Sequence, residues 1–122
     1  MPTESKTVLT ESDLSHFTGS ENYYRIAFSK IVITDGVHFV REKAQSYWLV
    51  DKIAALQHEQ KIAKCEFQVW KLKVDNQSAV LTMKEDSDQP DIYSEKIDYT
   101  DFPLAEITFW LANQVLYLPS EH

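Results

Sequence analysis

The stretch Ser46–Val74, SYWLVDKIAALQHEQKIAKCEFQVWKLKV, decides the fold that we expect. In its first part, apolar residues recur at 47, 50 and 54 and again at 49, 53 and 56, which is helical spacing. Ser46 suits the N-cap of this helix. Residues 66–74 are rich in β-branched and aromatic types and predict a long strand. The pair predicts a small α+β core in which the helix lies against a sheet that includes 66–74.

Trp48 falls on the polar side of the predicted helix, beside Asp51 and Lys52, and Ala55 leaves space next to it. An indole on a half-polar face is typical of a partner surface or a ligand groove. The alternative is that Trp48 packs under a loop or strand of its own chain, as large aromatic residues commonly do.

The predicted strand 66–74 changes phase along its length. Phe67 and Val69 point one way, whereas Trp70, Leu72 and Val74 point the other. Two explanations are open: a bulge near Val69–Trp70, or a strand that is covered on both faces over part of its length.

The N-terminal part predicts a short helix over 11–17 and strands over 23–28 and 31–34. Thr10 and Asp13 have the spacing of a capping box for that helix. Asp35-Gly36 fits either a two-residue hairpin loop before a strand at 37–41 or a helix start capped by Asp35. We favour the helix, because 37, 40, 44 and 47 are apolar at helical spacing.

The C-terminal part predicts a turn at 75–77 and strands at 78–84 and 92–99. A last helix over 102–113 follows from the spacing of Leu104, Ile107 and Leu111. A short strand at 115–118 ends at Pro119. The predicted fold class is therefore α+β, with an antiparallel sheet of about four strands and helices packed on one face.

Length and composition indicate one folded unit. The chain has 122 residues, of which 43% are hydrophobic, so we expect a flexible N-terminus at 1–8 and a single domain at 9–122. Only two glycines are present, so no Gly-rich phosphate loop can be written.

The net charge of −7 disfavours direct binding to nucleic acid and to anionic membranes. A single cysteine allows no intrachain disulfide, which fits a reducing compartment. The N-terminus lacks the features of a signal peptide, and no run of residues has the length of a membrane span. We therefore expect a cytoplasmic protein.

Five strings look familiar as a set: FTG at 17–19, TDGV at 34–37, YWLVDKIA at 47–54, FQVWKL at 67–72 and YTDFPL at 99–104. In this order the chain, from about Leu9 to Leu118, resembles a small uncharacterised bacterial family, a domain of unknown function. The resemblance implies a bacterial origin and one compact domain, and it carries over no functional residue.

Metal and cofactor chemistry find little support in the sequence. The histidines lie far apart, no HxxxH or CxxC spacing exists, and we predict neither a metal nor a cofactor. Cys65 lies next to Glu66, whose charge would raise the pKa of the thiol rather than activate it.

Asp98 and Asp101 are weak catalytic candidates, because two carboxylates at a strand-to-helix corner could act as acid and base. The alternative is that Asp101 caps the last helix and Asp98 lies on the surface.

Our first functional hypothesis is a non-enzymatic binding or interaction module, with homo-oligomerisation as its expected form. Its binding-surface candidates are Trp48, Asp51, Lys52 and Trp110, since the chain has more aromatic residues than a core of this size needs. One alternative is an acidic regulator or decoy of a nucleic-acid-handling protein. Another is a small-molecule enzyme that uses Asp98 and Asp101.

Overall fold

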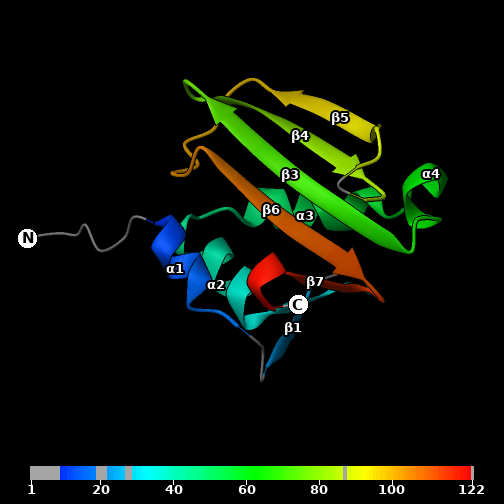
Figure 1. Ribbon diagram of the computed structural model, residues 1–122, viewed down its shortest axis with the longest axis horizontal. Helices are drawn as coiled ribbons and strands as arrows, with labels where there is room; N and C mark the ends of the chain where they lie inside the picture. Colours follow the sequence, from blue (N-terminus) through cyan, green and yellow to red (C-terminus); the bar gives the residue numbers. More distant parts are fainter. Residues whose placement is uncertain (1–8, 19–21, 27–28, 87, 122) are drawn as a thin grey trace, which may run out of the picture.

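The computed structural model describes residues 9–18, 22–26, 29–86 and 88–121. The expected flexible segment 1–8 lies outside them. Figure 1 shows the described elements, a seven-stranded sheet with short helices. The strands are β1 (Tyr23–Arg25), β2 (Val32–Thr34), β3 (Phe67–Asp75), β4 (Ser78–Lys84), β5 (Asp91–Ile97), β6 (Glu106–Ala112) and β7 (Val115–Tyr117). The helices are α1 (Glu11–Ser15), α2 (Asp35–Lys43), α3 (Tyr47–Leu56), α4 (Gln60–Ala63) and the 3-10 helix η2 (Pro119–Glu121).

The sheet is mixed, which makes the predicted fold class wrong. Its strand order is β1-β2-β7-β6-β3-β4-β5, and β2 and β7 run parallel while the other neighbours are antiparallel. The expected antiparallel sheet of about four strands with a helical face is therefore replaced by seven strands with one parallel pair and few helices.

The main source of the error is the segment predicted as a helix over 102–113. It contains strand β6, which pairs with β3 from Phe67↔Ala112 to Lys73↔Glu106. The helical spacing of Leu104, Ile107 and Leu111 is not the only pattern in this segment, because burial also alternates from one residue to the next. Ile107, Phe109 and Leu111 are buried, and the residues between them are only partly covered. The segment forms a strand because this alternation fits the sheet edge that β3 presents.

The apparent change of phase in strand β3 does not come from a bulge. It keeps one continuous register against both β4 and β6. Gln68 and Trp70 are buried on one face, and Val69 is 8% exposed on the other. Of the two explanations, coverage on both faces over part of the strand is the correct one.

Helix α2 confirms the helical alternative for the residues after Thr34. Its N-cap is Thr34 rather than Asp35, and the Thr34 hydroxyl accepts a hydrogen bond from the Val37 amide at 3.4 Å. Helix α3 forms where expected, but Ser46 makes no side-chain cap. Its hydroxyl instead donates to the Val40 carbonyl at 3.3 Å and so ties α3 to α2.

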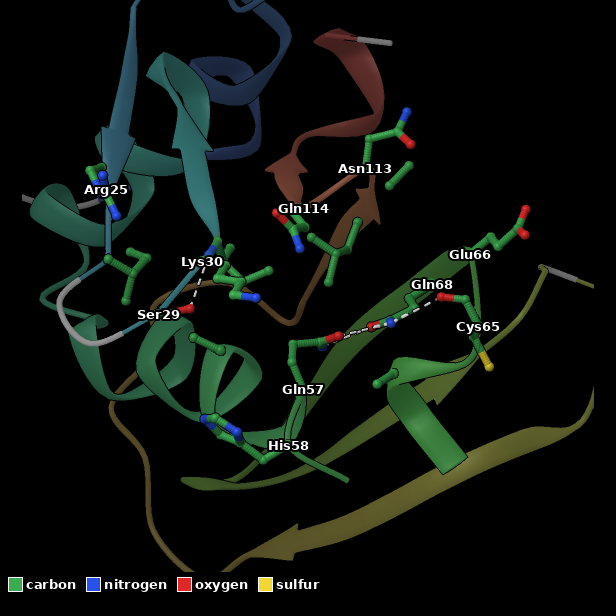
Figure 2. A pocket seen from close by; sticks show the side chains of 16 residues that line it. Arg25, Ser29, Lys30, Gln57, His58, Cys65, Glu66, Gln68, Asn113 and Gln114 are labelled. Carbon is green, nitrogen blue, oxygen red and sulfur yellow. Dashed lines mark hydrogen bonds between the residues drawn. The ribbon is translucent and has the colours of Figure 1, made fainter. Parts of the chain in front are cut away.

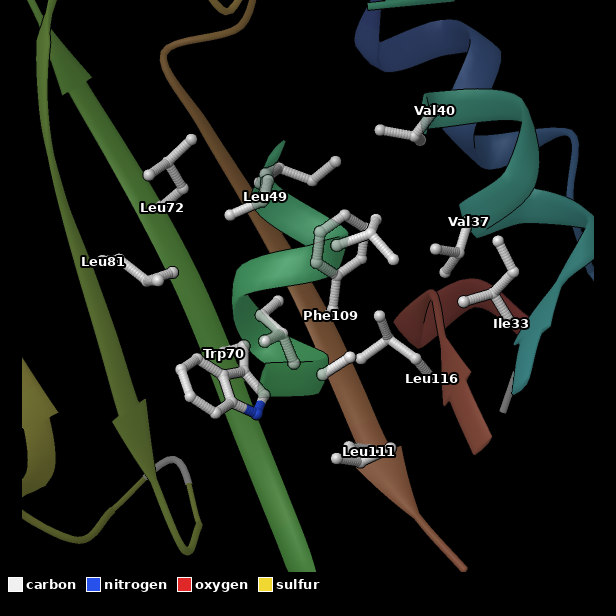
Figure 3. Close-up of a cluster of buried hydrophobic side chains, with 14 of the residues drawn as sticks. Ile33, Val37, Val40, Leu49, Trp70, Leu72, Leu81, Phe109, Leu111 and Leu116 are labelled. Atoms are coloured by element: carbon white, nitrogen blue, oxygen red, sulfur yellow. The ribbon is translucent and has the colours of Figure 1, made fainter. Parts of the chain in front are cut away.

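The core lies between α3 and the centre of the sheet. Leu49, Val50 and Ile53 of α3 are fully buried in one cluster with Trp70 and Phe109. Figure 3 shows the side chains of β3 and β4 directed toward this helix. The expected packing of residues 46–56 against a sheet that contains 66–74 is thus confirmed.

Shorter predictions depended on local signals and are largely confirmed. Helix α1 has the capping box between Thr10 and Asp13. Strand β1 covers the first half of the predicted 23–28, of which 27–28 lie outside the described residues. The predicted turn at 75–77 joins β3 to β4 through Asn76 and Gln77, which have φ of 51° and 71°. Positive φ at both central residues is the signature of a type I′ hairpin turn.

Glu121 of η2 caps the N-terminus of α2. Its carboxylate accepts hydrogen bonds from the Thr34 hydroxyl at 2.7 Å, the Gly36 amide at 3.0 Å and the Leu118 amide at 2.9 Å. A carboxylate at a helix N-terminus is stabilised by the free amides and the helix dipole. Gly36 permits this approach, because a Cβ there would lie 2.6 Å from Glu121 Oε1 and 2.7 Å from Leu118 Cδ1.

We therefore expect Gly36→Ala to destabilise the protein by about 1–2 kcal/mol, because Glu121 must leave its three donors. Without this contact, alanine in a helix would stabilise by up to about 1 kcal/mol. Urea unfolding of the wild type, both single variants and Gly36→Ala/Glu121→Ala measures the coupling. An equal effect of Gly36→Ala with and without Glu121 would contradict the assigned cap.

Candidate functional site

A cleft of about 1000 Å³ opens between two walls (Figure 2). One wall comes from the connection between β1 and β2 and from the turn between β6 and β7. The other comes from the last turn of α3, from α4 and from the start of β3. The lining residues are Arg25, Ile26, Ser29, Lys30, Ile31, Ala54, Gln57, His58, Ala63, Cys65, Glu66, Gln68, Leu111, Ala112, Asn113 and Gln114.

Two glutamine side chains form the inner end of this cleft. Gln57 of α3 and Gln68 of β3 pair through both amide groups, with each nitrogen 2.9 Å from the other oxygen. Gln68 is only 3% exposed and accepts a further hydrogen bond from the fully buried Trp70 indole at 2.9 Å. Its nitrogen also lies 3.0 Å from the Ile62 carbonyl and 3.2 Å from the Cys65 carbonyl. These partners satisfy a polar group that would be costly to bury alone.

The opposite wall carries positive charge. Arg25 and Lys30 are exposed there, and in the described part of the chain neither side chain has a hydrogen bond or an ion pair. His58 adds an imidazole, and Glu66 is the single carboxylate among the lining residues. In a chain of net charge −7, the cleft therefore holds a local excess of cations.

The turn between β6 and β7 brings Asn113 and Gln114 to the cleft. Both residues have positive φ, at 52° and 64°, as in a type I′ turn. The Gln114 carbonyl accepts a hydrogen bond from the Val32 amide at 2.9 Å, which anchors the turn to β2. In Figure 2 Lys30 and Gln114 lie on one side of the cleft and the Gln57–Gln68 pair on the other.

Cys65 is poorly suited to nucleophilic chemistry. Burial raises the pKa of its thiol, and Glu85 raises it further. The sequence suggested Glu66 as the acidic neighbour, whereas the structure brings Glu85 close instead. The thiol donates a weak hydrogen bond to the Lys61 carbonyl at 3.6 Å, and Figure 2 shows the sulfur turned away from the amide pair.

Of the binding-surface candidates from the sequence, Trp48, Asp51 and Lys52 lie together on α3 and Trp110 lies on β6, and none of them lines the cleft. Trp48 is half-buried against the core, and Asp51 is exposed beside it on α3. Lys52 forms an ion pair with Glu95 of β5, at 3.1 and 3.2 Å. Trp110 lies on β6, on the sheet face opposite the buried Phe109.

Asp98 and Asp101 are both exposed, in the connection that leads from β5 to β6. No helix starts at Asp101, so the predicted capping role is wrong. The Thr100 hydroxyl organises this corner instead by accepting a hydrogen bond from the Phe102 amide at 3.1 Å. Neither acid contributes to the cleft. Among the described residues, no group of three or more His, Cys, Asp and Glu side chains is placed to hold a metal ion.

Sequence reasoning missed the residues that give the cleft its character: Arg25, Lys30, Gln57, Gln68 and Gln114. They come from segments that lie far apart in the chain, and amide side chains have no diagnostic spacing. The one usable signal was Gln68, a polar residue on the face of β3 that also carries Trp70 and Leu72.

The Lys52–Glu95 pair generates a pH-dependent contribution to stability. The Tyr93 hydroxyl donates to Glu95, and this bond together with Lys52 holds the pKa of Glu95 below its ordinary value. A carboxylate with a lowered pKa stabilises the fold above its ordinary pKa near 4.5, and this contribution is lost as the pH falls. Burial and Glu95 raise the pKa of Tyr93 to about 12.

We expect Glu95→Gln to destabilise the protein at pH 7 by less than about 1 kcal/mol, because solvent screens the half-exposed pair. The difference from wild type should shrink as the pH falls below 4.5 and vanish once the pH is below the lowered pKa of Glu95, where the wild-type carboxylate is also neutral. Urea unfolding at pH 7 and at successively lower pH values measures it. Glu106→Gln is the control, because its lysine is 3.9 Å away and exposed. A Glu95→Gln effect that keeps the same size from pH 7 down to the most acidic pH would refute the assigned ionic role.

Comparison with known proteins gives a family and no function. No curated protein and no solved structure matches the chain. Among the described residues, no helix has the combination of length and apolar character needed to cross a membrane. The model of a family of unknown function, DUF6876, matches residues 8–122 and so covers nearly the whole chain. The resemblance to a family of unknown function is thereby confirmed, and the chain belongs to DUF6876.

Proposed function

We propose that this domain is a non-enzymatic binding module whose cleft takes a small, polar, negatively charged ligand. The observation that carries the proposal is that Arg25 and Lys30, on the wall of a cleft of about 1000 Å³, have no hydrogen bond or ion pair to any residue that the structure describes. A cleft of this size is in the range of ligand sites, and such sites combine apolar lining with a few polar groups that fix orientation.

The lining supports binding rather than catalysis. Ile26, Ile31, Ala54 and Leu111 give it apolar surface, and the amides of Gln57 and Gln114 offer neutral hydrogen-bonding groups. Cys65 is a lining residue that could act as a nucleophile, but the raised pKa of its thiol keeps it protonated at neutral pH.

Titration with succinate and with inorganic phosphate, followed by ¹H–¹⁵N NMR, tests the proposal. We expect saturable shifts at the cleft residues, and an affinity at least about tenfold lower in Arg25→Gln/Lys30→Gln, since hydrogen bonds to charged groups are strong.

Lys73→Gln/Lys96→Gln is the matched control, because it removes the same charge from exposed positions on β3 and β5 outside the cleft. It should bind like the wild type. If neither anion shifts the cleft resonances, or if both double variants lose affinity equally, the proposal is wrong.

A second candidate function is self-association through the outer face of the sheet. Trp110 pairs across the strands with Val69 and Tyr117, and its ring contacts Phe67 and Tyr117 edge-on at centroid distances of 5.5 and 6.1 Å. These half-buried rings form an aromatic group on the face away from α3, and such groups are enriched at protein interfaces.

We expect analytical ultracentrifugation to show a homodimer whose dissociation constant rises at least about tenfold in Trp110→Thr, because Trp is frequently a hot-spot residue. Threonine keeps the strand propensity of β6. Tyr99→Thr, which removes a 67% exposed ring elsewhere, should leave the dimer unchanged. A wild-type protein that stays monomeric at millimolar concentration would end this candidate.

A further inference from the structure

We propose that the ligand of the cleft carries a hydrogen-bond donor as well as a negative charge, and that the Gln57 side-chain oxygen accepts this donor. The inference rests on the proposed function of the cleft and narrows its ligand class. This need for a donor follows from the hydrogen bonds that the Gln57–Gln68 pair has already used.

The orientation of the Gln68 amide follows from its neighbours. The Trp70 indole nitrogen can only donate, so the atom of Gln68 that lies 2.9 Å from it must be the oxygen. The Ile62 and Cys65 carbonyls can only accept, so the atom that faces them must be the nitrogen. Exchanging the two atoms would set donor against donor and acceptor against acceptor.

This orientation fixes Gln57 as well. Its nitrogen lies 2.9 Å from the Gln68 oxygen and 3.2 Å from the Ile53 carbonyl, so both of its hydrogens are used. Its oxygen lies 2.9 Å from the Gln68 nitrogen. The Gln68 oxygen, which accepts from both Gln57 and Trp70, has no lone pair left.

The Gln68 nitrogen faces three acceptors and has two hydrogens to give them. Whichever two acceptors receive these hydrogens, the Gln57 oxygen keeps at least one free lone pair. The remaining capacity of the pair is therefore that of an acceptor. Gln57 lines the cleft and is half-buried, so this lone pair is within reach of a bound molecule.

The two ends of the cleft therefore favour different groups of the ligand. An anionic group would meet Arg25 and Lys30, and an N–H or O–H group would meet Gln57. The ligand class is a small carboxylate or phosphate that also bears a hydroxyl, amine or amide N–H. A plain anion, or an anion that presents a second acceptor to Gln57, would leave this oxygen without its partner.

The test compares two probes that differ only in the replacement of an N–H group by an oxygen atom. N-methylsuccinamate carries a carboxylate and an amide N–H, and monomethyl succinate has an ester oxygen in place of that N–H. The corresponding glutarate derivatives extend the reach by one methylene. Affinities come from ¹H–¹⁵N NMR titration, in which the side-chain amides of Gln57 and Gln68 and the Trp70 indole report directly.

We expect each amide acid to bind about three- to tenfold more tightly than its ester, in at least one of the two lengths. In Gln57→Met the preference for the amide acid over the ester should disappear, because the acceptor for the N–H group is removed. This variant is suited to the test, because Gln68 still donates to the Ile62 and Cys65 carbonyls and accepts from Trp70. Gln60→Met, an exposed glutamine of α4 outside the cleft, should keep the preference.

The outcomes distinguish a failure of the donor requirement from a failure of the proposed anion site. If amide and ester bind equally well in the wild type, or if succinate binds and neither amide acid does, the donor requirement is wrong and the anion site stands. If the preference survives in Gln57→Met, the acceptor has been assigned to the wrong residue. If none of these acids binds, the anion site fails and the inference fails with it.

Discussion

The pairing of β6 with β3 is the contact on which the rest of the structure depends. The chain builds an N-terminal hairpin, β1–β2, and a meander, β3–β4–β5, and these two parts share no strand pairing. The C-terminal hairpin joins them, because β6 pairs with β3 over seven residues and β7 pairs in parallel with β2. Without β6, the inner face of β3, which includes Trp70 and Leu72, would lose its neighbour and the core would be open on one side.

The cleft is a consequence of this way of joining the sheet. Strand β7 is short and meets β2 over two residue pairs, so the two halves separate beyond the turn at 113–114. The separation places the start of β3 beside the cleft, where the buried Gln68 lies on the same face as Trp70. An amide at this position must be fully paired, because an unpaired buried donor or acceptor costs about 1–3 kcal/mol. Gln57 and two main-chain carbonyls provide this pairing.

The sequence predicts the elements whose signals are local and fails where a distant partner decides. The capping box at Thr10, the turn at Asn76–Gln77 and the helix after Ser46 depend on neighbours within a few residues, and all three are present. Ile107 and Leu111 fit both a helix and a strand, and only the free edge of β3 selects the strand. The cleft could not be predicted for the same reason. Its lining residues come from positions 25–114, and its place in the fold depends on the pairing of β6 with β3, which the predicted helix over 102–113 excluded.

The distribution of charge limits the kind of anion that the proposed site could accept. The chain as a whole is at −7, so an approaching anion is repelled at long range and attracted only near Arg25 and Lys30. Screening confines both effects to about 10 Å at 0.1 M salt. A compact anion can place all of its charge against the two cations, within that distance. A long polyanion would extend its remaining charges over the acidic surface, where each of them is opposed. In the site that we propose, the same two cations would therefore favour a small anion over a polyanion such as a nucleic acid.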